Sequence, residues 1–269
     1  ILHHDSAILI VDKPAGLLSV PGKDPGKEDC LIERLRGPFP EVLLVHRLDC
    51  DTSGVMVFAL TKAAQANLGQ QFEKRQTKKV YLARLWGLLE PKEGQVDLPL
   101  CVDWPNRPRQ HVNHENGKPA ITDWRVQRHD GKTTRVRLMP LTGRSHQLRV
   151  HMLAMGHPIL GDPIYATGAA RDFPRLMLHA ETLSLHHPGS GRVMAVWSTE
   201  PALQLYSGNH LQGIGKGGAV YRPRTGVCLE PQGYPDAPNH PHFPSAVLRP
   251  GQWRRGRIVY RFSSLPVRL

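Results

Sequence analysis

The chain has 269 residues, 40% of them hydrophobic, and a formal net charge of +12. This size and composition can fill one large core or two modest ones, and they exclude a transmembrane helix because no run of about 18 apolar residues occurs. The positive excess favours a polyanionic partner, most commonly nucleic acid, although a basic protein without such a partner would carry the same charge.

The first part of the chain alternates short apolar runs with turns. The run AILIV at residues 7–11 stops at Lys-Pro-Ala-Gly, which indicates a strand that leads into a turn. Ala64, Leu68 and Phe72 have near-helical spacing behind Thr61, a candidate N-cap. We predict strands at residues 7–11, 42–45, 54–60 and 80–86, and helices at residues 29–35 and 62–75.

The pattern continues with a loop, a hairpin, a helix and a strand. Residues 98–119 are rich in Pro, Asn, Arg and Gly and are interpreted as a loop or insertion. Asp130-Gly131 separates two strand-like segments and indicates a β-hairpin. We predict strands at residues 121–128, 133–139 and 176–185, and a helix at residues 145–155. Hairpins with a few interspersed helices are typical of an α+β fold rather than of a regular βαβ repeat.

The composition changes near residue 190. Gly, Pro and Asn accumulate over residues 205–255, with strand-like pieces at 226–229 and 258–262 and no helical periodicity. We therefore expect a domain boundary there, with one domain at residues 1–192 and a short all-β unit at residues 193–269.

Reactive residue types are concentrated in three short segments. These are HRLDCDTSG from residue 46, KKVYLAR from residue 78 and TGRSHQLRVH from residue 142. They place an acid in a turn between strands, a tyrosine inside a strand and arginines at the start of a helix. Each feature also has an ordinary explanation, namely a turn aspartate, strand packing and a solvated helix face.

Taken together, the three segments resemble the signature segments of RluA-type pseudouridine synthases. IVDKPAGLLSVPG near the start, GHPILGD and RLMLHAETLSLHHP occur in the family's order, so the resemblance covers residues 1–192. It implies a mixed, mainly antiparallel sheet with flanking helices. It also implies isomerisation of uridine to pseudouridine in RNA, without a metal or another cofactor. LSVPG and DLPLCVDWPNRPRQ are most similar to the RluA branch, which implies tRNA anticodon loops and 23S ribosomal RNA as substrates.

The resemblance also assigns roles to residues of this chain. Asp49 would be the catalytic carboxylate, either attacking the nucleoside or removing a ribose proton, and both alternatives require its ionised form. Arg149 would pair with Asp49 and keep it charged and aimed. Tyr81 would lie against the flipped uracil, and Arg47 would fill the space that the base leaves. Further RNA contacts are expected collectively from Arg107, Arg109, Lys118, Arg144 and His146.

The tail resembles a different family. Segments such as VWSTEPALQLYSGNHL and GKGGAVYRPRTGVCLEPQGYPDAPNH are similar to the end of aldose 1-epimerase (galactose mutarotase). The resemblance makes Glu230 the counterpart of the general base and implies a short fragment of a β-sandwich. Sugar mutarotation by the tail is therefore an alternative activity, but one carboxylate cannot supply both the proton donor and the acceptor of ring opening. An RNA-binding module without catalysis is the other alternative.

The remaining expectations concern surroundings and partners. The cysteines are widely spaced and form no CxxC pair, which argues against a zinc ribbon or a disulfide framework and fits a reducing cytoplasm. We expect a monomer without an obligatory protein partner and without membrane attachment. Because the sequence starts at Ile1 rather than Met, we expect a short segment to precede it. The cysteines are Cys30, Cys50, Cys101 and Cys228.

Overall fold

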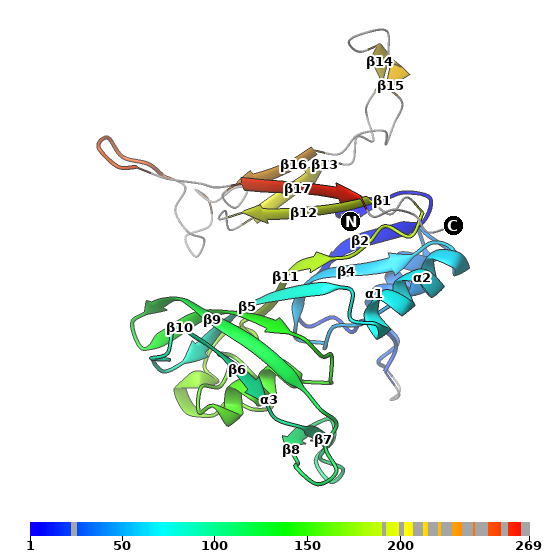
Figure 1. Cartoon of the computed structure of the whole chain (residues 1–269). Helices are drawn as coiled ribbons and strands as arrows, with labels where there is room; N and C mark the ends of the chain where they lie inside the picture. The colour runs from blue at the N-terminus through cyan, green and yellow to red at the C-terminus, as the bar shows by residue number, and fades with distance from the viewer. Residues whose placement is uncertain are drawn as a thin grey trace.

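A large twisted sheet forms the centre of the computed structural model (Figure 1). The structure describes residues 1–22 and 26–189, and beyond them residues 192–198, 202–206, 212–214, 220–221, 228–232, 239, 247–253 and 258–264. Nine strands make the sheet in the order β1-β2-β4-β11-β5-β10-β9-β6, with β3 also paired to β4. They are β1 (His3–His4), β2 (Ile8–Lys13), β3 (Leu43–Leu44), β4 (Ser53–Ala59), β5 (Lys78–Trp86), β6 (Glu93–Asp97), β9 (Ile121–Asp130), β10 (Thr133–Pro140) and β11 (Leu178–Ser184).

Both faces of the β2–β4 end of the sheet are covered by helices. Met56 and Phe58 of β4 pack on the side of α1 (Leu31–Arg36), whereas Val57 and Ala59 pack on the side of α2 (Lys62–Glu73). Because both faces are buried, β4 is a nearly continuous apolar run rather than an alternating one. The predicted N-cap of α2 is confirmed, since Thr61 Oγ1 accepts a hydrogen bond from Ala64 N at 3.1 Å.

A third helix, α3 (Gln147–Ala154), covers one face of the β5–β10 end. Leu148 and Met152 of α3 pack against Leu85 of β5 and Val136 and Leu138 of β10. The predicted hairpin between β9 and β10 is confirmed, and its two strands pair in antiparallel register around Gly131. None of the helices in the described part of the chain combines the length and apolar character needed to cross a membrane.

The two ends of the sheet meet where β4 and β11 pair in parallel, while the other neighbouring strands are antiparallel. Gly54 lies opposite Ala180 with a φ of +121°, and a Cβ at this position would lie 2.3 Å from Ala180 O. Glycine is therefore required for the two backbones to approach each other. The last residue of the HRLDCDTSG segment thus joins the two ends of the sheet.

Residues 93–119 contain strands that were not predicted from the sequence. Residues 93–97 form the edge strand β6, which was not predicted, and the expected loop contains the hairpin of β7 (Leu100–Val102) and β8 (Gln110–Val112). Three-residue strands produce no readable alternation. Leu100 is buried with Val150 and Tyr165, so tertiary packing stabilises this hairpin.

The tail forms separate pairs of antiparallel strands. They are β12 (Arg192–Ser198) with β17 (Ile258–Ser264), β13 (Ala202–Tyr206) with β16 (Cys228–Gln232), and β14 (Gly213–Ile214) with β15 (Val220–Tyr221). The expected strand at residues 258–262 is confirmed, whereas residues 226 and 227 of the other expected piece lie outside the described residues. The α+β class with a β-rich tail is confirmed.

Candidate active site

The segment that carries Asp49 is fastened to the turn that follows β2. Asp49 lies between β3 and β4. The carbonyl of its neighbour Cys50 accepts a hydrogen bond from Lys13 Nζ at 2.8 Å and another from Gly16 N at 3.0 Å. These contacts limit backbone freedom next to Asp49.

The Lys13 ammonium is fully buried and is shared among three backbone carbonyls. Besides Cys50 O, it donates to Pro14 O at 2.9 Å and to Leu17 O at 2.6 Å. Burial lowers the pKa of Lys13, while negative charge in the Asp49 loop opposes that effect. All three donors of the ammonium are therefore used to hold the two turns together.

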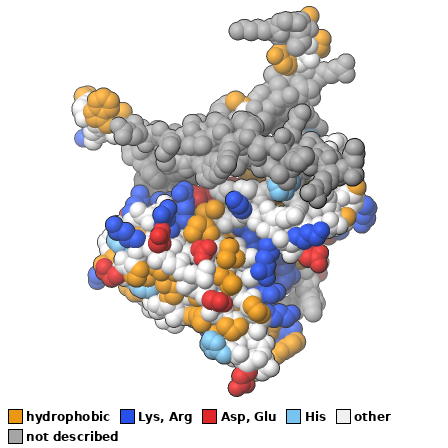
Figure 2. Space-filling model, viewed as in Figure 1, with side chains coloured by type: hydrophobic (Ala, Val, Ile, Leu, Met, Phe, Trp, Pro, Cys, Tyr) orange, Lys and Arg blue, Asp and Glu red, His pale blue; other side chains and the backbone are white. Residues whose placement is uncertain are grey.

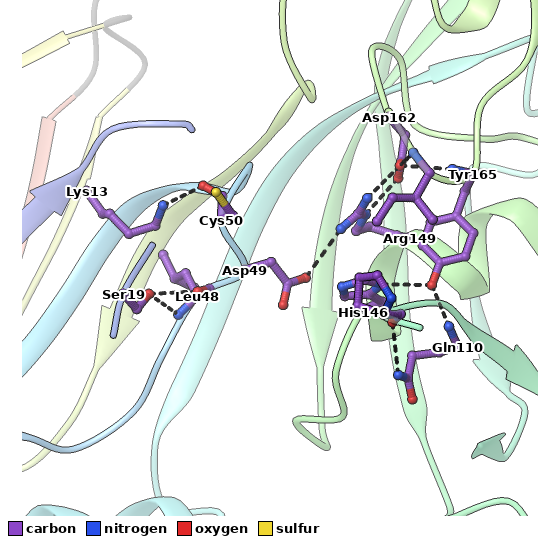
Figure 3. Close-up of polar contacts among 12 residues, drawn as sticks. Lys13, Ser19, Leu48, Asp49, Cys50, Gln110, His146, Arg149, Asp162 and Tyr165 are labelled. Atoms are coloured by element: carbon purple, nitrogen blue, oxygen red, sulfur yellow. Dashed lines mark hydrogen bonds and ion pairs between the residues drawn. The ribbon is translucent and has the colours of Figure 1, made fainter. Parts of the chain in front are cut away.

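Ser19 holds the other side of Asp49. Its buried hydroxyl donates to Leu48 O at 2.7 Å and accepts from Leu48 N at 3.2 Å. The residues before and after Asp49 are thus both fixed, while its side chain points toward Arg149 (Figure 3). A fixed carboxylate suits catalysis because a small misplacement of a reacting group lowers the rate strongly.

Arg149 of α3 supplies the positive charge that faces Asp49. Its side chain is only 2% exposed, and its Nη1 lies 3.8 Å from Asp49 Oδ2. The same guanidinium forms two hydrogen bonds to Asp162, from Nε at 2.7 Å and from Nη2 at 2.6 Å. Burial alone would lower the pKa of Arg149, but Asp162 first and Asp49 second raise it above its usual value. Arg149 therefore stays charged and is held from behind while it faces Asp49.

Two cavities meet at this ion pair. The larger has a volume of about 790 Å³ and the smaller about 110 Å³. The Asp49 side chain is 30% exposed, so its carboxylate can reach a ligand in either cavity. Both cavities are lined by Arg47, Leu48, Asp49, His146 and Arg149.

Tyr81 of β5 forms part of the wall of the smaller cavity. Lys79, Thr142 and Leu178 line the same space. Burial, and then the charge of Asp49, raise the pKa of Tyr81, so its phenol stays protonated at neutral pH. The cavity thus offers an aromatic ring and an uncharged hydroxyl beside the carboxylate.

His146 lies at the entry to α3 and lines both cavities. Its backbone is left-handed, with φ of 53°, and its Nδ1 lies 2.8 Å from the Tyr165 hydroxyl. Burial lowers the pKa of His146, although Asp49 opposes this. The ring therefore lies between the two cavities and the residues that contact Arg149.

The other predicted RNA contacts lie at different distances from the cavities. Arg47 is exposed and lines both, and Arg144 lines the smaller one while its Nε donates to Pro119 O at 3.1 Å. Three of the predicted residues do not occur among the described residues that line the two cavities, and their RNA contacts remain predictions. They are Arg107, stacked on Trp104 at 4.0 Å, Arg109, which donates to Ile164 O, and the exposed Lys118.

Four residues of this arrangement were not singled out from the sequence. Asp162 ends the GHPILGD segment, and Lys13 and Ser19 lie in IVDKPAGLLSVPG. These three residues therefore belong to segments that carry the family resemblance, but the resemblance was not used to assign them a role. Tyr165 lies outside all quoted segments. Strand and helix periodicity cannot show that these side chains converge on Asp49.

Two further features concern the predicted sites. Glu230 belongs to β16, but its side chain lies outside the described residues, so its role in the tail remains a prediction. Within the described ranges, no group of three or more His, Cys, Asp or Glu side chains could hold a metal ion.

Comparison with known proteins gives the family. A family model described as RNA pseudouridylate synthase matches residues 7–154. The dual-specificity RNA pseudouridine synthase RluA of Escherichia coli K12 is 55% identical over 196 residues, which cover 72% of this chain and 90% of that protein. The chain belongs to the RNA pseudouridylate synthase family. Its enzyme class is therefore that of the pseudouridine synthases, which are isomerases.

Other relatives agree with this membership. RluA of Yersinia pestis is also 55% identical, and the aligned part covers 72% of this chain and 95% of the Yersinia pestis protein. The structure of human RNA pseudouridylate synthase domain containing 1 has a TM-score of 0.59 and 32% identity. The aligned part covers 68% of this chain and 76% of the human chain. Human RNA pseudouridylate synthase domain containing 4 has a TM-score of 0.58 and 29% identity, over 69% of this chain and 83% of its own.

A second family model, aldose 1-epimerase, matches residues 161–261. The start of this match overlaps the synthase structure, because Asp162 holds Arg149 and β11 pairs with β4 and β5 of the large sheet. The similarity of the tail to aldose 1-epimerase is confirmed.

Proposed function

We propose that this synthase converts uridine to pseudouridine with Asp49 as its catalytic carboxylate. The observation that carries the proposal is the ion pair between the partly exposed Asp49 and the buried Arg149 at the junction of two cavities. Family membership gives the reaction, and this ion pair offers an anion that is fixed and yet accessible.

The reaction needs little besides positioned charge. The C1′–N1 bond breaks, the uracil turns, and C5 bonds to C1′; C5 loses a proton and N1 gains one, so the product is an isomer. Asp49 takes part either as a nucleophile or as a base toward the ribose, and Arg149, 3.8 Å away, aims its carboxylate in both cases. Tyr81 would pack against the uracil in the smaller cavity.

The target base must leave the RNA stack to reach Asp49. Arg47 is exposed at the rim of both cavities, a suitable place from which to fill the vacated space. Figure 2 shows Lys and Arg side chains gathered in a band on one face of the described part of the molecule, as expected for contact with a phosphate backbone.

For the substrates, we infer tRNA anticodon loops and 23S ribosomal RNA, modified in the cytoplasm by a monomer. The support is the high identity to proteins named dual-specificity RNA pseudouridine synthases. RNA loops are recognised by shape over many contacts, so no single residue of this chain identifies the target.

We also propose that the synthase domain comprises residues 1–192 and that residues 193–269 are an aldose 1-epimerase-like fragment. The support is that the large sheet continues through β11 to Ser184, while the tail strands pair among themselves. Mutarotation is not favoured, because Glu230 alone would have to supply both acid and base.

The decisive variant is Asp49→Asn, which keeps the size of the side chain but removes its charge. We expect it to bind RNA and to form no pseudouridine, measured by mapping the modified positions in RNA incubated with each protein. Asp172→Asn, at an exposed position, is the matched control and should keep full activity. Full activity of Asp49→Asn would refute the role of Asp49, whereas loss of activity with retained binding excludes a module that only binds RNA.

A further inference from the structure

Tyr165 connects the β7–β8 hairpin to Arg149. Its hydroxyl accepts a hydrogen bond from the backbone N of Gln110 in β8 at 2.8 Å and is 2.8 Å from His146 Nδ1. Its ring lies beside Arg149, with the guanidinium carbon 5.1 Å from the ring centroid. One tyrosine, 5% exposed, therefore contacts the hairpin, the entry of α3 and the guanidinium that faces Asp49 (Figure 3).

In one arrangement of the protons in this cluster, the Tyr165 hydroxyl both accepts and donates a hydrogen bond. Since Gln110 N donates to the Tyr165 oxygen, the hydroxyl proton is free to be donated to His146 Nδ1. His146 then carries its own proton on Nε2 and is neutral. Burial lowers the pKa of His146 and raises that of Tyr165, so both groups are uncharged at neutral pH, as this arrangement requires.

The backbone at and beside Tyr165 is held both by the residue that binds Arg149 and by the β7–β8 hairpin. Asp162 Oδ1, which accepts from Arg149, also accepts from Ile164 N at 2.9 Å and from Tyr165 N at 3.0 Å. From the hairpin, Arg109 donates to Ile164 O and places its guanidinium carbon 5.1 Å from the Tyr165 ring centroid. The ring therefore lies against two guanidinium groups, one from the hairpin and one from the active site.

We propose that Tyr165 is a positioning residue of the synthase, whose hydroxyl holds the β7–β8 hairpin and His146 in place around Arg149 and so keeps Asp49 aimed. The inference rests on the proposed function of Asp49. Tyr165 acts through Arg149 and touches neither cavity among the described lining residues. Its removal should therefore slow turnover much more than it weakens the binding of RNA.

Tyr165→Phe tests this, because it keeps the ring between the guanidinium groups and removes only the hydroxyl. We expect kcat to fall about 10-fold, the scale of one lost hydrogen bond that orients a catalytic group, with KM changed less than about 2-fold. Tyr221→Phe, the same substitution at an exposed tyrosine of β15, is the matched control and should leave both constants unchanged. An unchanged kcat, or a change confined to KM, would overturn the proposal.

The single variant Arg109→Ala provides a second test that does not depend on the folding of Tyr165→Phe. If Arg109 only contacts phosphate, its loss raises KM; if it holds the Tyr165 segment, its loss lowers kcat. We expect the fall in kcat, and we expect the double variant to lose less than the product of the two single losses, since both act through one connection. If the loss in the double variant equals the product of the two single losses, Arg109 and Tyr165 act independently, which would count against the proposal.

The two proposals fail in different ways. Absence of pseudouridine formation by the unaltered chain would overturn both, whereas a fully active Tyr165→Phe beside an inactive Asp49→Asn would overturn only this one.

Discussion

His46 shows how burial of one side chain in the HRLDCDTSG segment makes stability depend on pH. Its Nε2 accepts a hydrogen bond from Val57 N at 3.1 Å, and its ring is stacked on Phe72 with centroids 4.6 Å apart. An imidazole can accept at Nε2 only when that nitrogen is unprotonated. Burial, and then the charge of Lys79, lower the pKa of His46 from 6.5 to about 4.

We therefore predict that acid destabilises the synthase through His46. Below pH 6.5, His46 of the unfolded chain binds a proton, whereas His46 of the folded chain does not until the pH approaches 4. The contribution of His46 to the free energy of unfolding is therefore complete above pH 6.5 and is lost as the pH falls toward 4. The loss from this group is about 3 kcal/mol at pH 4. Urea denaturation between pH 7.5 and 4 should show a shallower pH dependence for His46→Gln than for the unaltered protein.

The exposed His111 gives the matched control for this measurement. His111→Gln should keep the pH dependence of the unaltered chain. If His46→Gln keeps it as well, other buried histidines account for the acid sensitivity.

Among the residues, the sequence predicted the charged pair but not what supports it. The family resemblance implied that Asp49 pairs with Arg149, and the structure places Asp49 Oδ2 3.8 Å from Arg149 Nη1. Asp162 and Tyr165 contact Arg149 in the folded chain, and neither contact was predicted from the sequence. A sequence pattern shows which residues are reactive, but not which of them meet.

Among the elements, the parallel pairing of β4 with β11 depends on Gly54. Its φ of +121° is unfavourable for other residues, and an added Cβ would also lie 2.5 Å from Ala180 N. Because Asp49 precedes β4, a shift of this strand would also move the loop that carries Asp49.

Gly54→Ala should therefore destabilise the protein by more than about 3 kcal/mol, since strain and overlap with the backbone act together. The matched control is Gly69→Ala in α2, where an added Cβ would meet nothing within 4 Å. There alanine should stabilise the helix by about 0.5–1 kcal/mol. Urea denaturation should show a lower free energy of unfolding for Gly54→Ala and a higher one for Gly69→Ala. A small decrease for Gly54→Ala would show that β4 and β11 can move apart with little loss of stability.

The elements that the sequence predicted include the long ones, and also the short helix α1 and the short strand β3. Helix α2 and the β9–β10 hairpin follow from periodicity, capping and an Asp-Gly turn. The β7–β8 hairpin does not, because its strands are three residues long and Leu100 is buried by α3 and Tyr165. Local preference cannot predict an element that other elements hold in place.

At the scale of the whole molecule, the large sheet and the tail differ in the support available to each strand. Interior strands of the nine-stranded sheet have partners on both sides, whereas the described tail strands occur in two-stranded pairs. A two-stranded pair is marginally stable unless other elements pack on it, and its edges can pair with other chains.

We predict that limited proteolysis cuts between residues 190 and 215 and leaves a stable N-terminal core that still forms pseudouridine. Part of this interval lies outside the described residues, so the prediction rests on the pairing of the described strands in and around it. Time-resolved digestion of the full chain with mass spectrometry of the products would locate the cuts. Equal resistance along the chain would show that the tail is packed as firmly as the sheet.

The sequence by itself indicated the pseudouridine synthase family, because the resemblance of its segments, in the family's order, needs no folded structure to be read. It also determined the long elements and the change of composition near residue 190. Only the tertiary structure decided how Lys13, Ser19, Asp162 and Tyr165 surround the Asp49–Arg149 pair. These contacts join residues that lie far apart in the chain, and burial and strand pairing, rather than local preference, bring them together.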